Sequence, residues 1–412
     1  MRGKRIILFS GIFLLPLILI FSQCSNLFDK QEADPRGNLY AGYKSCMKCH
    51  SDVYKSYLHT AHFQSTRDAA NSTVQGDFSA GHNSFTFNDS LKVVMEKRKD
   101  GLYQVGYINN KKQQEQRFDI AFGGVKAETY LYWKDSTTYQ LPISYFKRLH
   151  NWTNSPGYDT TRIDFGRMVG KRCFECHSSY IKQLPSPQQS LASVVKFDQA
   201  TLINGIDCER CHGPAANHVN FHTDYPEEKK ARYITNYASL SRQQKIDMCA
   251  SCHSGNSSMP VRSMFAFKPG DTLSNFLETE YYPTVRTGAA QLDVHGNQSQ
   301  MLGASQCFIQ SKMDCGTCHN THVKDRGNIA LYSQRCMNCH KADGHNFCKM
   351  ASKIGVSIKN NCVNCHMPER PSAIIAVQTS AQGRAAPYFV RTHRIAVYPQ
   401  EVEKVLSYIN KK

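Results

Sequence analysis

Residues 315–322 of this 412-residue chain read CGTCHNTH, and the first five of them form a Cys-x-x-Cys-His unit. The unit occurs seven times, and the copies, called motifs 1 to 7 below, begin at Cys46, Cys173, Cys208, Cys249, Cys315, Cys336 and Cys362. Two thiols at this spacing can bond to both vinyl groups of one haem, and the adjacent histidine can then bind the iron. Zinc, the alternative for paired cysteines, gives no reason for a histidine to follow each pair.

The motifs therefore predict seven covalently attached c-type haems. With 17 cysteines in 412 residues, chance would give on the order of 0.03 copies of the motif. The predicted attachment residues are Cys46, Cys49, Cys173, Cys176, Cys208, Cys211, Cys249, Cys252, Cys315, Cys318, Cys336, Cys339, Cys362 and Cys365. The predicted proximal iron ligands are His50, His177, His212, His253, His319, His340 and His366.

Ten further histidines are available as sixth iron ligands, because imidazole binds haem iron well. His322 follows proximal His319 by three residues, which is too short to reach the opposite face of the same ring. It would therefore serve a neighbouring haem and tie the haems into a compact array. His218, His222 and His345 also follow a motif closely and favour the same interpretation. Methionine is the alternative sixth ligand.

The N-terminus has the pattern of an export signal. Arg2, Lys4 and Arg5 precede an apolar run at 6–21, and Cys24 follows it closely. The segment resembles a bacterial lipoprotein signal, with residues 1–23 removed and Cys24 lipidated. A simple secretory signal and an uncleaved anchor are the alternatives. All three place the body of the protein outside the cytoplasm, and the lipoprotein signal predicts a periplasmic or outer-membrane lipoprotein.

Two cysteines remain after the motifs and Cys24 are assigned. These are Cys307 and Cys348, an even pair that an oxidising compartment could join. A Cys307–Cys348 disulfide is therefore predicted, and two unrelated buried thiols are the alternative.

The formal net charge of +17 and the pI near 9.1 at first indicate nucleic-acid binding. Without residues 1–23 the formal charge is about +14, and seven haems would bring about fourteen propionate charges. Lysine and arginine side chains are thus expected to be propionate partners, and nucleic acid is excluded as a partner.

The motifs are unevenly spaced, with 127 residues between Cys46 and Cys173. Alternating or β-branched stretches at 84–87, 91–98, 102–109, 117–122, 130–133 and 137–143 predict strands in this gap. Asp100-Gly101 and Asn109-Asn110 mark turns between them. A helix is predicted at 241–248 with Ser241 as its N-cap.

The expected fold is mainly helical and irregular, organised around stacked haems, with a small antiparallel β insertion. The expected segments are a signal peptide (1–23), a lipidated flexible tether (24–39), an N-terminal haem segment (40–79), the β insertion (80–147), a six-haem domain (148–400) and a C-terminal helix or tail (401–412).

Four stretches resemble the superfamily of exported multihaem c-type cytochromes: GYKSCMKCHSDVYKSYLHTAHF at 42–63, GIDCERCHGPAANH at 205–218, CGTCHNTH at 315–322 and CVNCHMP at 362–368. That superfamily includes tetrahaem electron carriers and multihaem oxidoreductases. The stretches YLYWKDSTTYQLPISYF, SPGYD and CFECH resemble one branch of it. The resemblance implies distal ligands at His62, His218, His322 and His393, and His295 and His345 fit by position.

The full set of candidate distal ligands is thus His62, His218, His222, His295, His322, His345 and His393, with His59, His82 and His150 in reserve. His150 is expected to have a structural role. Electron relay between redox proteins is the expected function, with most irons held by two histidines. The alternative is an oxidoreductase that acts on a small nitrogen or sulfur species at one open haem. No catalytic residue is assigned.

Overall fold

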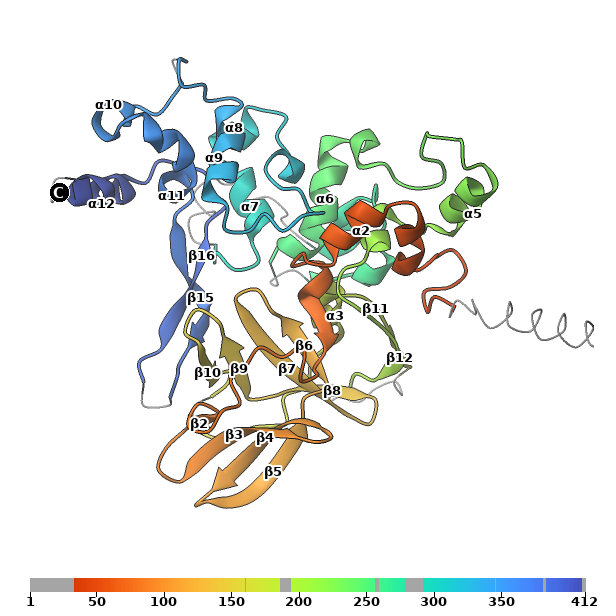
Figure 1. Ribbon diagram of the computed structural model, residues 1–412, viewed down its shortest axis with the longest axis vertical. Coiled ribbons are helices and arrows are strands. Elements are labelled where there is room, and N and C mark those ends of the chain that lie inside the picture. The colour runs from red at the N-terminus through yellow and green to blue at the C-terminus, as the bar shows by residue number, and fades with distance from the viewer. Residues whose placement is uncertain are drawn as a thin grey trace, which may run out of the picture.

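The computed structural model describes residues 33–159, 161–185, 194–255, 259–278, 292–344, 346–380 and 383–409. Figure 1 shows strands gathered at one end of the molecule and short helices at the other. Residues 66–154 form the strand-rich end and are called the β region; the other described residues are called the motif region. The predicted signal segment 1–23 and Cys24 lie outside the described residues. Among the described residues, no helix is long and apolar enough to cross a membrane.

Two antiparallel sheets build the β region. One has the order β2-β3-β4-β5, with bounds β2 (Ser84–Thr86), β3 (Leu91–Arg98), β4 (Gly101–Ile108) and β5 (Lys111–Arg117). The other has the order β1-β6-β7-β9-β10, with β8 also paired to β7; its bounds are β1 (Thr66–Asp68), β6 (Ile120–Gly123), β7 (Ala127–Lys134), β8 (Thr137–Gln140), β9 (Ile143–Phe146) and β10 (Asn151–Asn154). The predicted turn at Asn109-Asn110 is confirmed, because both residues have positive φ, as a two-residue hairpin turn requires.

Buried aromatic side chains fill the core of the β region. Trp152 is fully buried, its ring centroid lies 5.2 Å from Tyr145 and 5.3 Å from Phe78, and its Nε1 donates to the Asp77 carbonyl at 2.7 Å. A Cβ on Gly76 would collide with the Trp152 ring, so this close approach requires glycine. The region therefore has a hydrophobic core of its own.

The six-stranded sheet is covered on both faces. Successive side chains of a strand point to opposite faces, so Ala121 enters the aromatic core while Ile120 and Phe122 face the other way. There they pack against Phe174 of α3 (Lys171–His177), which carries motif 2, and against Phe197. This second cluster joins the β region to the motif region.

The motif region consists of short helices and three two-stranded hairpins. The helices are α2 (Ser51–Tyr57), α3, α4 (Cys208–His212), α5 (Ala216–Asp224), α6 (Arg242–His253), α7 (Gln298–Gly303), α8 (Gln306–Ile309), α9 (Ile329–Met337), α10 (Ala351–Ile354), α11 (Cys362–His366) and α12 (Pro399–Ile409). The 3-10 turns are η1 (Tyr43–Lys48), η2 (Phe63–Ser65), η3 (Tyr237–Ser239), η4 (Met264–Ala266), η5 (Leu273–Asn275), η7 (Cys315–Thr317) and η8 (Val356–Asn360). The hairpins are β11 (Ser178–Gln183) with β12 (Phe197–Asn204), β13 (Met259–Pro260) with β14 (Leu277–Glu278), and β15 (Glu369–Val377) with β16 (Ala386–Arg391).

The predicted β insertion at 80–147 is too small. The structure adds β1 and β10 to it, and the three hairpins add further strands in the motif region. The reason is long-range pairing: Thr66 of β1 lies opposite Phe122 of β6, so nothing in the local sequence marks β1 as a strand. The predicted helix at 241–248 is confirmed and longer, since α6 runs to His253 and Ser241 caps it in a capping box with Gln244.

Candidate haem-binding site

One continuous cavity runs through the motif region. Its volume is about 4120 Å³, and its wall includes every cysteine and histidine of the seven motifs. A pocket for one small ligand usually measures roughly 300–1,000 Å³. The cavity is therefore large enough for several bulky groups, and all seven motifs share it.

Local helical turns fix the geometry of each motif. Residues i and i+3 share a face of a helix, so both cysteines of a motif point the same way. In motif 3 the side chain of Asp207 caps α4 by accepting from the Arg210 N–H, and in motif 5 Asp314 caps η7 in the same manner with Thr317. An aspartate directly before the first cysteine thus starts two of the motif turns.

Thiols of different motifs meet inside the cavity. Four pairs of thiols from different motifs lie close enough to interact: Cys46 with Cys208, Cys176 with Cys252, Cys249 with Cys315, and Cys336 with Cys362. These contacts join motifs 1 and 3, 2 and 4, 4 and 5, and 6 and 7. The motifs are consequently neighbours in space even where they are far apart in the chain.

Four motif histidines face a second imidazole across the cavity. Two imidazoles that bind one metal at about 2 Å place their ring centroids roughly 6 Å apart. The observed centroid distances are 6.4 Å for His50–His218, 6.0 Å for His212–His322, 6.1 Å for His62–His253 and 6.2 Å for His319–His393. In each pair the second histidine lies after a motif other than the one that supplies the first histidine, so every pair connects two motifs.

Backbone contacts hold the second histidines in place. The carbonyl of His62 accepts the Ile206 N–H at 2.9 Å. The preceding Gly205 approaches the Phe63 carbonyl oxygen so closely that a Cβ at position 205 would collide with it. The carbonyl of His322 accepts the Ser56 hydroxyl at 2.7 Å. The segment that follows motif 1 is therefore held against the residues just before motif 3 and against the residues just after motif 5.

Several imidazoles are fixed with one nitrogen directed to the cavity. Nδ1 of His218 donates to the Arg232 carbonyl at 2.8 Å, and Nδ1 of His366 donates to the Ala396 carbonyl at 2.9 Å. Similar bonds join His212 to Thr235 and His340 to Asn346. Since a carbonyl only accepts, Nε2 of the neutral ring keeps its lone pair for a metal.

Burial keeps two of the facing histidines neutral. It lowers the pKa of His62 to about 4, with His253 contributing, and it lowers the pKa of His393 to about 4, with His319 contributing. A neutral imidazole is the form that binds a metal.

The structure does not bring the other candidates opposite a motif histidine. His222 packs against His218 with ring centroids 4.6 Å apart, and its Nε2 accepts the Arg232 N–H at 3.4 Å. His295 lies near His177 and His253 without ring contact to either. His345 lies outside the described residues. Of the reserve histidines, His59, His82 and His150 are exposed, and His150 lies in the β9–β10 turn with φ of 47°.

His177 of motif 2 has a different neighbour, which the sequence analysis missed. Phe122 of β6 stacks on its ring with centroids 4.9 Å apart and planes 9° apart. Within the described residues no second imidazole faces His177, His340 or His366. Phe122 belongs to the β region, so only the long-range packing reveals this contact.

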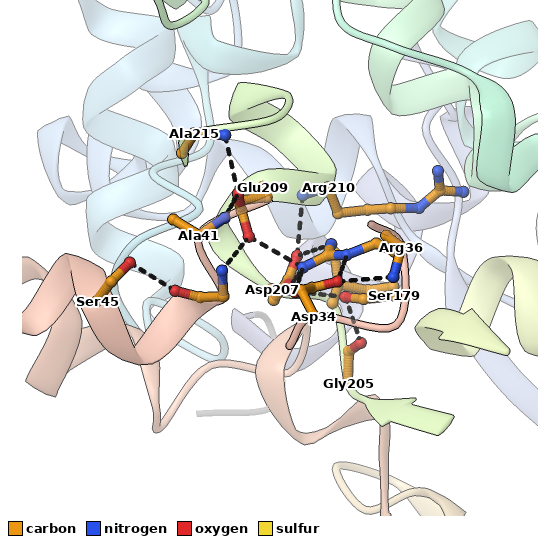
Figure 2. A network of polar contacts seen from close by, with 12 residues as sticks. Asp34, Arg36, Ala41, Ser45, Ser179, Gly205, Asp207, Glu209, Arg210 and Ala215 are labelled. Carbon is orange, nitrogen blue, oxygen red and sulfur yellow. Dashed lines mark hydrogen bonds and ion pairs between the residues drawn. The ribbon is translucent and has the colours of Figure 1, made fainter. Parts of the chain in front are cut away.

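A buried ion network, shown in Figure 2, ties the chain ahead of motif 1 to motif 3. Arg36 lies 2.8 Å from Asp34, 2.8 Å from Asp207 and 2.9 Å from Glu209, and all four side chains are at most 7% exposed. Glu209 also accepts the Ala41 and Ala215 N–H groups at 2.9 Å. Asp34 and Arg36, which belong to the predicted tether at 24–39, are held in this network.

Cys307 and Cys348, the two described cysteines outside the motifs, are free thiols in the structure. Cys307 lies near Cys339 of motif 6, and Cys348 lies near Cys365 of motif 7. The predicted Cys307–Cys348 disulfide stays a prediction.

The residues present fit c-type haem. The cavity is lined by paired thiols, by imidazoles that face each other and by cationic side chains with unused hydrogen-bond donors. The Nε atoms of Arg172, Arg210 and Arg335 are buried and have no hydrogen-bond partner among the described residues, and all three side chains line the cavity. Such donors suit propionate groups.

Comparisons with known proteins agree with this chemistry in one part of the chain. The profile of the family described as cytochrome c554 and c-prime matches residues 146–213, which contain motifs 2 and 3. No curated protein sequence matches the chain. The crystal structure of outer cell wall cytochrome OcwA aligns with a TM-score of 0.49 and 15% identity, over 89% of this chain and 81% of that chain. The family match supports c-type haem binding and haem-based electron transfer by this chain.

Proposed function

We propose that this chain is a multihaem c-type cytochrome that relays electrons between redox partners outside the cytoplasm. The observation that carries the proposal is the set of four imidazole pairs, 6.0 to 6.4 Å apart, that face each other across one cavity lined by all seven motifs. When bound, c-type haem supplies a one-electron couple at its iron. The role of the protein is to hold seven such haems close together.

Each residue class has a distinct role in this proposal. The fourteen motif cysteines hold the haem edges covalently, and the motif histidines are the proximal ligands. His218, His322, His62 and His393 are the distal ligands opposite His50, His212, His253 and His319. His222, His295 and His345 remain candidates for the other three motifs. An iron with two histidines has no open position for a substrate, which favours relay over catalysis.

Location and partners follow from the sequence. The N-terminal signal pattern and Cys24 support a lipid-anchored protein in the periplasm or on the outer membrane. Other redox proteins would be its donor and acceptor.

The experiment that tests the cofactor content is intact-mass measurement of the mature protein. Seven haem additions are expected, because all seven motifs are complete and share the cavity. Fewer than six additions would contradict the proposal.

A second function, an oxidoreductase acting on a small nitrogen or sulfur species, is favoured by one observation at motif 2. His177 stacks on Phe122, and no described imidazole faces it. An iron held there by His177 alone would keep a position open. Carbon monoxide binding by the reduced protein, together with turnover of nitrite or hydroxylamine, would select this function over relay.

A further inference from the structure

We propose that Lys126 and Arg326, both beside Tyr388, form with Arg391 of the same hairpin a binding site for a carboxylate or another small oxyanion. The site lies on the wall of the cavity, where the β region meets the β15–β16 hairpin and the loop after motif 5. One possible occupant, a haem propionate, rests on the proposed function; the other, a free oxyanion, does not.

The first contact comes from the β region. Lys126 lies in the turn between β6 and β7, and its Nζ donates to the Phe389 carbonyl at 3.1 Å. The same Nζ lies 5.1 Å from the centroid of the Tyr388 ring. Phe146 of β9 also contacts Tyr388, and the two ring centroids lie 5.6 Å apart. Figure 1 shows the hairpin lying alongside the strands here.

The hairpin supplies the second cation. Arg391 of β16 donates to the Met367 carbonyl at 2.7 Å and, within motif 7, to the Val363 carbonyl at 3.1 Å and to Asn364 Oδ1 at 2.9 Å. Glu369 lies opposite Arg391 in the strand register, but its carboxylate pairs with Arg148 at 3.2 Å. The one carboxylate beside the cluster is therefore already engaged.

Arg326 supplies the third cation from the loop between η7 and α9. Its side chain has no hydrogen bond or ion pair with any described residue. It lies within electrostatic reach of Lys126, Tyr388 and His319. The preceding Asp325 acts on His319 and Tyr332. Arg326 thus keeps its full set of donors for a ligand.

Charge is poorly balanced at this place. Burial lowers the pKa of Lys126; Glu369 opposes this shift, and Arg326, Arg148 and Arg391 reinforce it. Lys126 and Arg391 are half-buried, Arg326 and Arg148 are exposed, and Glu369 is the one carboxylate acting among them, so an anion bound here would reduce the repulsion between the cations. Guanidinium groups match carboxylates and oxyanions in geometry, and the ammonium adds a point charge.

Two sources could supply this chemistry. A haem in the cavity carries propionates that could reach the site, and a small free oxyanion such as nitrite or phosphate could enter from solvent. Both would be bound by the same donors.

The test uses the haem-loaded protein and the variants Lys126→Gln and Arg326→Gln. Lys99→Gln is the matched control, since Lys99 is exposed in the β3–β4 turn and belongs to no cluster. Intact mass first establishes the haem content, so a failure of the proposed cytochrome function is distinguished from a failure of the anion-site proposal. Resonance Raman spectra then report the propionate bending modes, and calorimetric titration with nitrite and with phosphate reports free-anion binding.

If a propionate occupies the site, both variants shift a propionate mode, the control does not, and Arg326→Lys restores it in part. If a free oxyanion occupies it, the wild type binds nitrite or phosphate, and each variant binds it about tenfold more weakly, as expected for one lost charge-assisted hydrogen bond. The proposal is overturned if both variants match the control in both measurements.

Discussion

In the β region, two sheets pack around fully buried aromatic side chains such as Trp152, Tyr130 and Phe85. In the motif region, short helices and loops surround a cavity of about 4120 Å³. Protein interiors are normally close-packed, so a cavity of that size cannot be a stable empty core. The comparison indicates that the β region folds around its own side chains, whereas the motif region needs its cofactors as core.

The strongest way to break this comparison is to prevent haem attachment, for example by expression without the cytochrome c maturation machinery. The motif region should then lose its fold, because the cavity would be left without contents, while residues 66–154 should stay folded. Hydrogen exchange read by mass spectrometry would locate the protected segments.

Protection retained evenly across both regions would contradict the account. Loss of protection in the β region as well would show that its core depends on the cofactors.

Trp152→Ala should damage the β region selectively. Removing a fully buried tryptophan typically destabilises a protein by about 3–5 kcal/mol, and Trp152 contacts Tyr145 and Phe78 and bonds to Asp77. Chemical denaturation would be followed by tryptophan absorbance for the β region and by haem absorbance for the motif region, so the unfolding of the two regions could be compared. Trp152→Phe serves as the milder control, and an equal loss of haem absorbance at low denaturant would argue against separate cores.

Arg36→Met should destabilise the junction between motifs 1 and 3. Breaking a buried ion pair by removing one partner typically costs about 3–5 kcal/mol, and Arg36 has three buried carboxylate partners. Arg162→Met is the control, because its pair with Asp164 is exposed and should contribute about 0–1 kcal/mol.

The Arg36→Met variant should regain part of its lost stability at low pH. Burial already raises the pKa of Glu209. An acid whose folded-state pKa is raised binds its proton more tightly when folded, so its contribution to stability falls as pH rises. Without the Arg36 cation, the pKa of Glu209 should rise further, and stability should fall more steeply as pH rises. Denaturation midpoints measured from neutral to acidic pH would show whether the stability of the variant rises as pH falls. A variant whose stability decreases further on acidification would contradict this prediction.

Local signals predicted part of the fold. The alternation at 91–98 predicts β3 with its observed bounds, and Ser241 predicts the start of α6. β5, Lys111–Arg117, was missed because its side chains are polar and exposed, so no buried face marks it. β1 was missed because its partner β6 lies far along the chain, and β10 was not among the predicted strands although it pairs with the adjacent β9.

The candidate site divides in the same way. Motif spacing alone predicts the attachment residues, and four of the seven distal candidates lie opposite a motif histidine. Which histidine faces which motif could not be read from spacing, since His62 crosses from motif 1 to motif 4. Phe122 and Arg36 gave no local signal, because each meets its partners only in the folded chain.

Low-temperature EPR with spin quantification on the oxidised protein tests the central claim most directly. The account predicts at least four low-spin haems per chain, one for each facing imidazole pair. His322→Ala should convert one of them to high spin and let the reduced protein bind carbon monoxide, whereas His82→Ala, an exposed histidine of the β region, should change neither. Fewer than four low-spin haems in the wild type, or a His322→Ala spectrum identical to that of the wild type, would contradict it.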